Sequence, residues 1–252
     1  MKYFMEACCT SVADAVTAQR NGAARIELCS CLDIGGVTPS EGLIRETLLA
    51  LAEDSLSKVA PGSDGSCRGL IPVNVLVRPR GGDFVFSEEE ILETLADIEM
   101  CKRLVVKDSS GREHRVNGVV VGALRPDGGI DMAAMRRLVA AARPLQVTFH
   151  RAFDECADVE RGLEDVIALG CERLLTSGHA PDAFAGRFTL AALVRQAAGR
   201  IVILAGCGVR PHNIASIASA ALPVAKHSTL TPSVPVTAPS PLEFHSSTLT
   251  GW

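Results

Sequence analysis

Carboxylates and imidazoles that could move protons occur in short polar clusters along the chain. Glu27 lies in one such cluster, and His150 and Asp154 lie in another. Side chains of this kind act as general acids and bases when they reach a reacting group directly or through one water. We therefore take Glu27, His150 and Asp154 as candidate catalytic residues, with His150 or Glu27 as the base. The matching chemistry would be proton transfer, isomerisation or carbon–carbon bond cleavage.

A second set of residues could bind the anionic part of a small molecule. Arginine grips carboxylates and phosphates with two parallel hydrogen bonds. The glycines of the A-G-C-G-V-R segment at 205–210 would let backbone N–H groups approach a ligand where a helix begins. The candidate binding residues are Glu6, Arg78, Arg80, Arg151, Gly206, Gly208, His245 and Ser246. The same charges could instead neutralise one another in a polar plug.

The cysteines form a third group. There are nine of them and no C-x-x-C pair, so neither a disulfide framework nor a zinc ribbon is expected. Cys8 and Cys9 end one apolar segment, and Cys29 and Cys31 end the next. Consecutive residues of a strand point to opposite faces, whereas Cys29 and Cys31 could share a side if the chain stays extended. Free cysteines are also common as small buried apolar residues.

Strand-like and helix-like segments alternate along the chain and must position these groups. The predicted strands are 3–7, 25–28, 73–77, 116–121, 145–149, 173–176, 201–204 and 243–245, and the predicted helices are 11–21, 40–54, 87–103, 131–141, 157–169, 182–198 and 211–221. Helices between apolar strands indicate parallel βαβ units. The pattern favours an α/β fold of the (β/α)8 TIM-type barrel. An open doubly wound sheet is the alternative, although the first turn lacks its G-x-G-x-x-G signature.

We expect one barrel domain over residues 1–252. Three connections are long, at 55–71, 106–115 and 222–242, and the last contains five of the 13 prolines, which predicts an extended, flexible insertion. Only seven residues follow His245, too few for an eighth helix, so we expect an incomplete outer helix layer at the C-terminus. In a barrel the carboxyl ends of all strands meet at one mouth, where the residues named above would converge.

Composition argues against several functions. The formal net charge is −4 and aromatic residues make up only 4% of the chain, which disfavours nucleic-acid binding. No apolar run approaches 18 residues, and the N-terminal segment has no apolar signal region. We therefore expect a cytoplasmic protein without a membrane partner.

Several stretches together resemble the CutC family of copper homeostasis proteins. They are MEACCTSVADAVTAQRNGAARIELC, GGVTPS, VLVRPRGGDFVFS, DGGIDM, VTFHRAFDEC, LLTSG and EFHSS. The resemblance implies a cytoplasmic (β/α)8-type barrel, a homo-oligomer that is often a dimer, and a role in copper handling. This sequence departs from the family in its three long connections and in lacking the usual C-terminal helical region. Those departures bear on barrel closure and oligomerisation more than on the mouth residues.

The implied copper role gives the cysteines a specific chemistry. Cu(I) prefers thiolate, thioether and imidazole donors, and adjacent strands lie about 4.8 Å apart. Candidate ligands of one Cu(I) ion near the mouth are Cys8, Cys9, Cys29 and Cys31. Two leading functions stay open: a Cu(I)-binding copper-tolerance protein, or an enzyme for a small phosphorylated or carboxylated metabolite at the same mouth. A scaffold for protein partners is a third.

Overall fold

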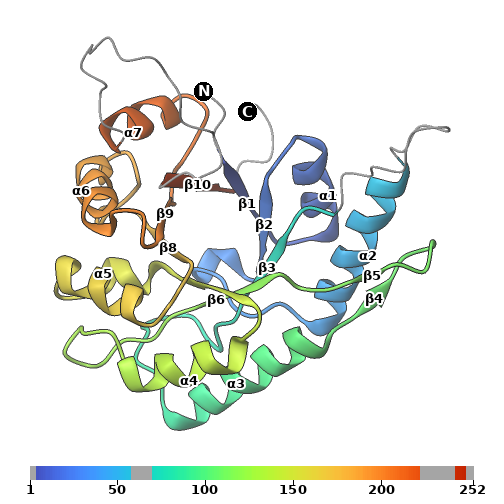
Figure 1. Ribbon diagram of the computed structural model, residues 1–252, viewed down its shortest axis with the longest axis horizontal. Helices are drawn as coiled ribbons and strands as arrows, with labels where there is room; N and C mark the ends of the chain where they lie inside the picture. The colour runs from blue at the N-terminus through green and yellow to red at the C-terminus, as the bar shows by residue number, and fades with distance from the viewer. Residues whose placement is uncertain (1–3, 58–69, 222–241, 248–252) are drawn as a thin grey trace.

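Short runs of apolar residues form a closed sheet of eight parallel strands in the computed structural model, which describes residues 4–57, 70–221 and 242–247 (Figure 1). The strands are β1 (Met5–Cys9), β2 (Arg25–Leu28), β3 (Val73–Leu76), β6 (Gly118–Val121), β7 (Gln146–Phe149), β8 (Arg173–Thr176), β9 (Val202–Ala205) and β10 (Leu242–Ser246). They follow one another round the barrel in the order β1-β10-β9-β8-β7-β6-β3-β2. The predicted TIM-type barrel is confirmed, and the open doubly wound sheet is not formed.

The last strand closes the barrel. β10 pairs in parallel with β9, where Leu242 lies opposite Ile203, and with β1, where Phe244 lies opposite Met5. Both edges of β10 are therefore used, so the eight strands leave no free sheet edge. Closure places β1 and β10 side by side although they stand at opposite ends of the sequence.

Helices surround the barrel (Figure 1). They are α1 (Val12–Arg20), α2 (Glu41–Ser57), α3 (Glu88–Arg103), α4 (Met132–Ala142), α5 (Val159–Ala168), α6 (Arg187–Ala197) and α7 (Ile214–Ala221). Local signals start several of them as expected: Ser87 and Glu90 form a capping box on α3, and the Asp131 carboxylate caps α4. No helix follows β10 within the described residues.

Two of the three long connections lie largely outside the part of the chain that the structure describes. These are the predicted insertion at 222–242, of which only Leu242 is described, and most of 55–71. The connection at 106–115 instead contains a hairpin that the sequence did not predict, β4 (Val106–Lys107) and β5 (Glu113–His114). The Asp108 carboxylate bonds the His114 ring at 2.7 Å inside it.

Strand alternation divides the buried side chains into two groups. One face of each strand packs against the helices in the main apolar core, to which Ala7, Cys9 and Leu28 belong. The other face points into the barrel, where Cys8 and Cys29 belong to a separate small cluster. The alternation therefore sends Cys8 and Cys9 to different sides of the same strand.

The barrel interior below its mouth is filled by an ion-pair network. The Arg25 guanidinium bonds the Glu6 carboxylate and, at 2.6 Å, the Glu243 carboxylate. Arg173 reaches Glu243 at 3.3 Å from the other side. Burying a charge is costly unless it is paired and hydrogen-bonded, and this network pairs its charges.

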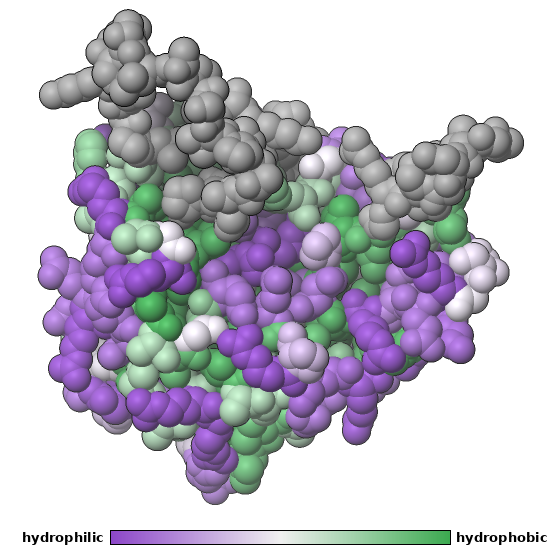
Figure 2. Space-filling view, viewed as in Figure 1, coloured by the Kyte–Doolittle hydropathy of each residue, from purple (hydrophilic) through white to green (hydrophobic). Residues whose placement is uncertain are grey.

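Hydrophilic residues cover much of the face shown in Figure 2 outside the grey segments, with hydrophobic residues in patches between them. Among the described residues, the search for a helix both long and apolar enough to span a bilayer found none.

Candidate functional site

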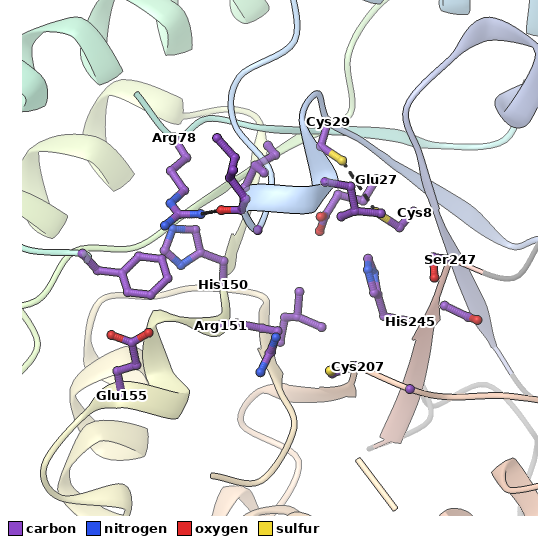
Figure 3. A pocket seen from close by; sticks show the side chains of 18 of the residues that line it. Cys8, Glu27, Cys29, Arg78, His150, Arg151, Glu155, Cys207, His245 and Ser247 are labelled. Carbon is purple, nitrogen blue, oxygen red and sulfur yellow. Dashed lines mark hydrogen bonds between the residues drawn. The ribbon is translucent and has the colours of Figure 1, made fainter. Parts of the chain in front are cut away.

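A cavity of about 520 Å³ opens where the carboxyl ends of the strands meet (Figure 3). Side chains from strands far apart in the sequence line it, as the barrel geometry predicts. Of the residues singled out from the sequence, those lining the cavity are Cys8, Glu27, Cys29, Arg78, His150, Arg151, Gly208, His245 and Ser246. Those outside the lining are Glu6, Cys9, Cys31, Arg80, Asp154 and Gly206.

Two of the four candidate thiols come together. The Cys8 and Cys29 sulfurs are 3.6 Å apart, and both residues are buried. Cys9 points to the helix side of β1, where its thiol contacts the carbonyl of Ala7. Cys31 is exposed with φ at +51°, so the chain turns there instead of staying extended. The expected group of four thiols is therefore corrected to a pair.

An imidazole and a carboxylate lie beside this pair. Ligand atoms of Cys8, Glu27 and His245 all fall within 4.8 Å of one another. His245 Nδ1 lies 2.8 Å from Glu6 Oε1, which fixes the ring and leaves Nε2 for another partner. A carboxylate behind a histidine in this manner is the arrangement that orients metal-ligating imidazoles in proteins.

Burial and neighbouring side chains set the pKa values of Glu6, His245 and Cys8. Burial by itself would raise the pKa of Glu6, but Arg25 and His245 bring it down to about 2. Burial by itself would lower the pKa of His245, but the Glu27 and Glu6 carboxylates raise it above its ordinary value. The contact with Cys29 and burial both raise the pKa of the Cys8 thiol. Without a ligand, Cys8 is therefore a protonated thiol at neutral pH.

Glu27 is the least satisfied carboxylate of the site. It is buried, and its Oε2 has no hydrogen-bond partner within the described residues. Burial, reinforced by the nearby Glu6, raises its pKa to about 7, although His245 and Arg25 act in the opposite direction. Glu27 can therefore take up or release a proton near neutral pH, which few carboxylates can do.

Arg78 lies across the cavity from the thiols (Figure 3). Its Nη atoms donate to the main-chain carbonyls of Gly36 at 3.1 Å and Gly82 at 2.6 Å, and its guanidinium carbon lies 4.5 Å from the centre of the Phe84 ring. No carboxylate within the described ranges comes within 4.0 Å of it, and its Nε has no partner there. Burial lowers the pKa of Arg78, but an arginine remains charged.

His150 lies next to Arg78 and is held in one tautomer. Its Nδ1 accepts a hydrogen bond from the Ala152 N–H at 3.2 Å, so the proton of the neutral ring is on Nε2. A Cβ at Gly122 would stand 2.5 Å from this ring, so only glycine leaves room for it. Burial and the Arg78 charge lower the pKa of His150 to about 3. The Nε2–H donor has no partner in the described part of the chain.

The other predicted polar residues hold loops together. The Asp154 carboxylate accepts hydrogen bonds from the Ser177 N–H at 3.0 Å and from Arg151 Nε at 2.9 Å. Arg80 bonds Glu90 at 2.5 Å and braces the turn that follows β3. Both roles are local, and neither side chain reaches the cavity.

Several lining residues were not identified from the sequence. Leu32, Ile34, Phe84 and Glu155 are among them. Leu32 and Ile34 lie on a 3-10 turn (Leu32–Ile34) and are 44% and 50% exposed. Two apolar residues in a polar loop after a strand were a signal that could have identified them as lining residues. Cys207, which lies in the A-G-C-G-V-R segment at 205–210, is half-buried and lines the cavity.

Comparison with known proteins identifies close relatives. The family model described as "CutC family" matches residues 3–231. A family protein CutC from Parabacteroides distasonis is 46% identical over 217 residues, which cover 86% of this chain and 78% of the relative. A family protein CutC from Xylella fastidiosa is 50% identical over 210 residues, which cover 83% and 68% of the two chains. Among solved structures, the "Putative Copper Homeostasis Protein CutC" from Streptococcus agalactiae superposes with a TM-score of 0.76 at 26% identity, covering 99% of this chain and all of the other.

Proposed function

The chain belongs to the CutC family, and from that premise we propose that it serves copper homeostasis by binding Cu(I) as its cargo in the cavity. The proposed ligands are Cys8, Cys29 and His245. The observation that carries the proposal is the 3.6 Å contact between the two thiols at the cavity wall. Two thiols and an imidazole are the donors that Cu(I) prefers over harder metal ions.

The spacing of the donors suits one ion. Metal–sulfur bonds are about 2.3 Å long, so two sulfurs on one ion can stand up to about 4.6 Å apart. The separation of the Cys8 and Cys29 sulfurs lies within that limit. The third donor, His245, is already oriented by the Glu6 carboxylate, so little rearrangement is needed to bring it to the ion.

Glu27 has a different part in this proposal. A carboxylate is a hard donor and a poor ligand for Cu(I). In its protonated form, Glu27 keeps a further negative charge away from two thiolates. We therefore propose it as a neighbour of the ion and not as one of its ligands.

The cellular setting belongs to the same proposal. All eight described cysteines are free thiols, which agrees with a reducing compartment such as the cytoplasm. We propose a cytoplasmic homo-oligomer, a dimer as its family resemblance implies, with no nucleic-acid or membrane partner.

The test is an anaerobic Cu(I) titration in competition with a strong chelator. We expect tight binding of one Cu(I) per chain by the wild type and its loss in the double variant Cys8→Ser/Cys29→Ser. Cys31→Ser is the matched control, because this thiol is exposed and lies outside the cavity, and it should bind as the wild type does. Equal binding by the double variant and the wild type would refute the thiol pair as the site.

A second candidate function rests on Glu27. A buried carboxylate with a free oxygen and a pKa of about 7 is suited to general acid–base catalysis on a small anionic metabolite. A thermal-shift screen of phosphorylated and carboxylated metabolites would find ligands, and each would be assayed for turnover. Glu27→Gln should abolish turnover while Cys8→Ser/Cys29→Ser retains it. Turnover that depends on the thiols and not on Glu27 would exclude this mechanism.

A further inference from the structure

The cavity is larger than a Cu(I) site requires. Its volume of about 520 Å³ lies in the range of pockets for small organic molecules, about 300–1,000 Å³. The proposed Cu(I) ligands account for one wall only. The wall that carries Arg78 and His150 has no part in metal binding.

That wall holds a buried cation with no carboxylate of the described residues within 4.0 Å. Arg78 is 4% exposed, and its hydrogen bonds go to uncharged carbonyls, while the Phe84 ring faces its guanidinium. Elsewhere in this barrel, the buried Arg25 has two carboxylates. A buried charge is costly unless it is paired, so the missing partner of Arg78 points to a bound anion.

Two neighbouring side chains also favour a bound anion at this wall. His150 is 4% exposed and presents an N–H at Nε2 that has no acceptor among the described residues. Arg151 lines the cavity with its side chain 43% exposed, and among the described residues its guanidinium is bound only through Nε, by Asp154. Glu155 lies on this side too (Figure 3), and its charge acts to raise the pKa of Arg78, but it forms no ion pair within 4.0 Å of the guanidinium.

Apolar side chains stand next to these donors. Leu32 and Ile34 line the cavity while remaining about half exposed, and Leu175 lines it from β8. Exposed aliphatic groups at the edge of a polar pocket favour a ligand with an apolar part. A bare inorganic anion would leave them uncovered.

We infer that the cavity has a second subsite, on the Arg78 wall, for a small organic acid. Its carboxylate or phosphate pairs with the Arg78 guanidinium, with His150 and Arg151 as additional donors. Its aliphatic part lies against Leu32 and Ile34. This subsite goes beyond Cu(I) binding and does not depend on it, because it shares no residue with the proposed metal ligands.

The test uses metal-free protein and isothermal titration with inorganic phosphate, acetate, butyrate and hexanoate. We expect saturable binding of the carboxylates, with affinity rising from acetate to hexanoate by up to about fourfold per buried methylene. Arg78→Met should weaken hexanoate binding at least tenfold, and Arg78→Lys should weaken it less. Arg161→Met, which removes an exposed charge on α5, is the control and should bind hexanoate as the wild type does.

Two further variants keep the outcome decisive. If Arg78→Met does not fold, Arg151→Met removes a half-exposed cavity arginine and should still weaken hexanoate binding several-fold. Cys8→Ser/Cys29→Ser should bind hexanoate unchanged, so a failure of the Cu(I) proposal is told apart from a failure of this one. Absence of saturable binding of all four probes to the wild type would overturn the inference. So would equal hexanoate affinity in the wild type and in folded Arg78→Met and Arg151→Met.

Discussion

Two layers inside the barrel use the same kinds of residue in opposite ways. In the lower layer, Arg25 stands between the carboxylates of Glu6 and Glu243, and every charge has a partner. In the upper layer, the described residues give the Arg78 side chain hydrogen bonds to main-chain carbonyls but no carboxylate within 4.0 Å, and an oxygen of Glu27 has no hydrogen-bond partner there. Arg25 of the lower layer and Glu27 of the upper layer are only two residues apart on β2.

The difference separates structural charge from functional charge. A buried ion pair that satisfies itself has nothing left to offer a ligand, whereas an unpartnered buried group is costly and needs another reason to be there. Glu6 connects the two layers, because it binds Arg25 below and orients His245 above. The lower layer therefore supports the site without taking part in its chemistry.

The sharpest way to break this comparison is to remove the central cation of the lower layer. Arg25→Met would remove the cation that Glu6 and Glu243 share, leaving Glu6 with His245 and Glu243 with Arg173, and we expect it to reduce the free energy of unfolding by about 3–5 kcal/mol. Arg78→Met should cost clearly less, because no carboxylate loses its partner there. Urea denaturation at pH 7 measures both. Equal losses for the two variants would mean that the layers do not differ in this way.

An acid titration of stability tests the upper layer alone. The pKa of His150 is lowered to about 3 in the folded protein, from about 6.5 when unfolded, so below pH 6.5 the unfolded state binds the proton more readily. The contribution of His150 to the free energy of unfolding is therefore complete above pH 6.5 and is lost as the pH drops towards 3. Between pH 7 and 3.5 we expect the wild type to lose about 4 kcal/mol of its free energy of unfolding relative to His150→Gln. Parallel stability curves for the two proteins would contradict the neutral, enclosed imidazole.

The sequence predicted the features that depend on local pattern. The barrel follows from alternating apolar segments, the start of α3 from the Ser87 capping box, and the opposite directions of Cys8 and Cys9 from the strand period. Cys31 was misjudged because one left-handed residue ends the extended chain, and no local signal required that turn.

Long-range pairing could not be predicted from the sequence. The sequence allows Arg78 or Arg151 to neutralise Glu6 or Glu27 in a polar plug, but the arginine that neutralises Glu6 is Arg25. Its bond to Glu243 joins positions 218 residues apart, and it depends on how β10 closes the barrel between β9 and β1. That closure also brings His245 to Glu6 and into the cavity lining.

Glu27 gives the smallest expected effect on the free energy of unfolding, and it tests whether the contrast between the two layers holds for a carboxylate. Burial raises its pKa to about 7 in the folded protein, so between pH 4.5 and 7 the folded state holds a proton that the unfolded state has lost. The contribution of Glu27 to the free energy of unfolding is therefore complete below pH 4.5 and is lost as the pH rises through 7. This pH dependence is opposite in sign to that of His150. We expect wild type to lose about 3 kcal/mol relative to Glu27→Gln between pH 4.5 and 8. Glu6→Gln should show no such gain at pH 8, because the Glu6 carboxylate is stabilised as an anion by Arg25 and His245. A constant difference in the free energy of unfolding between Glu27→Gln and the wild type across this range would contradict the raised pKa of Glu27. Glu27 would then be a stabilised carboxylate like Glu6, and the contrast between a paired and an unpaired layer would not apply to the carboxylates.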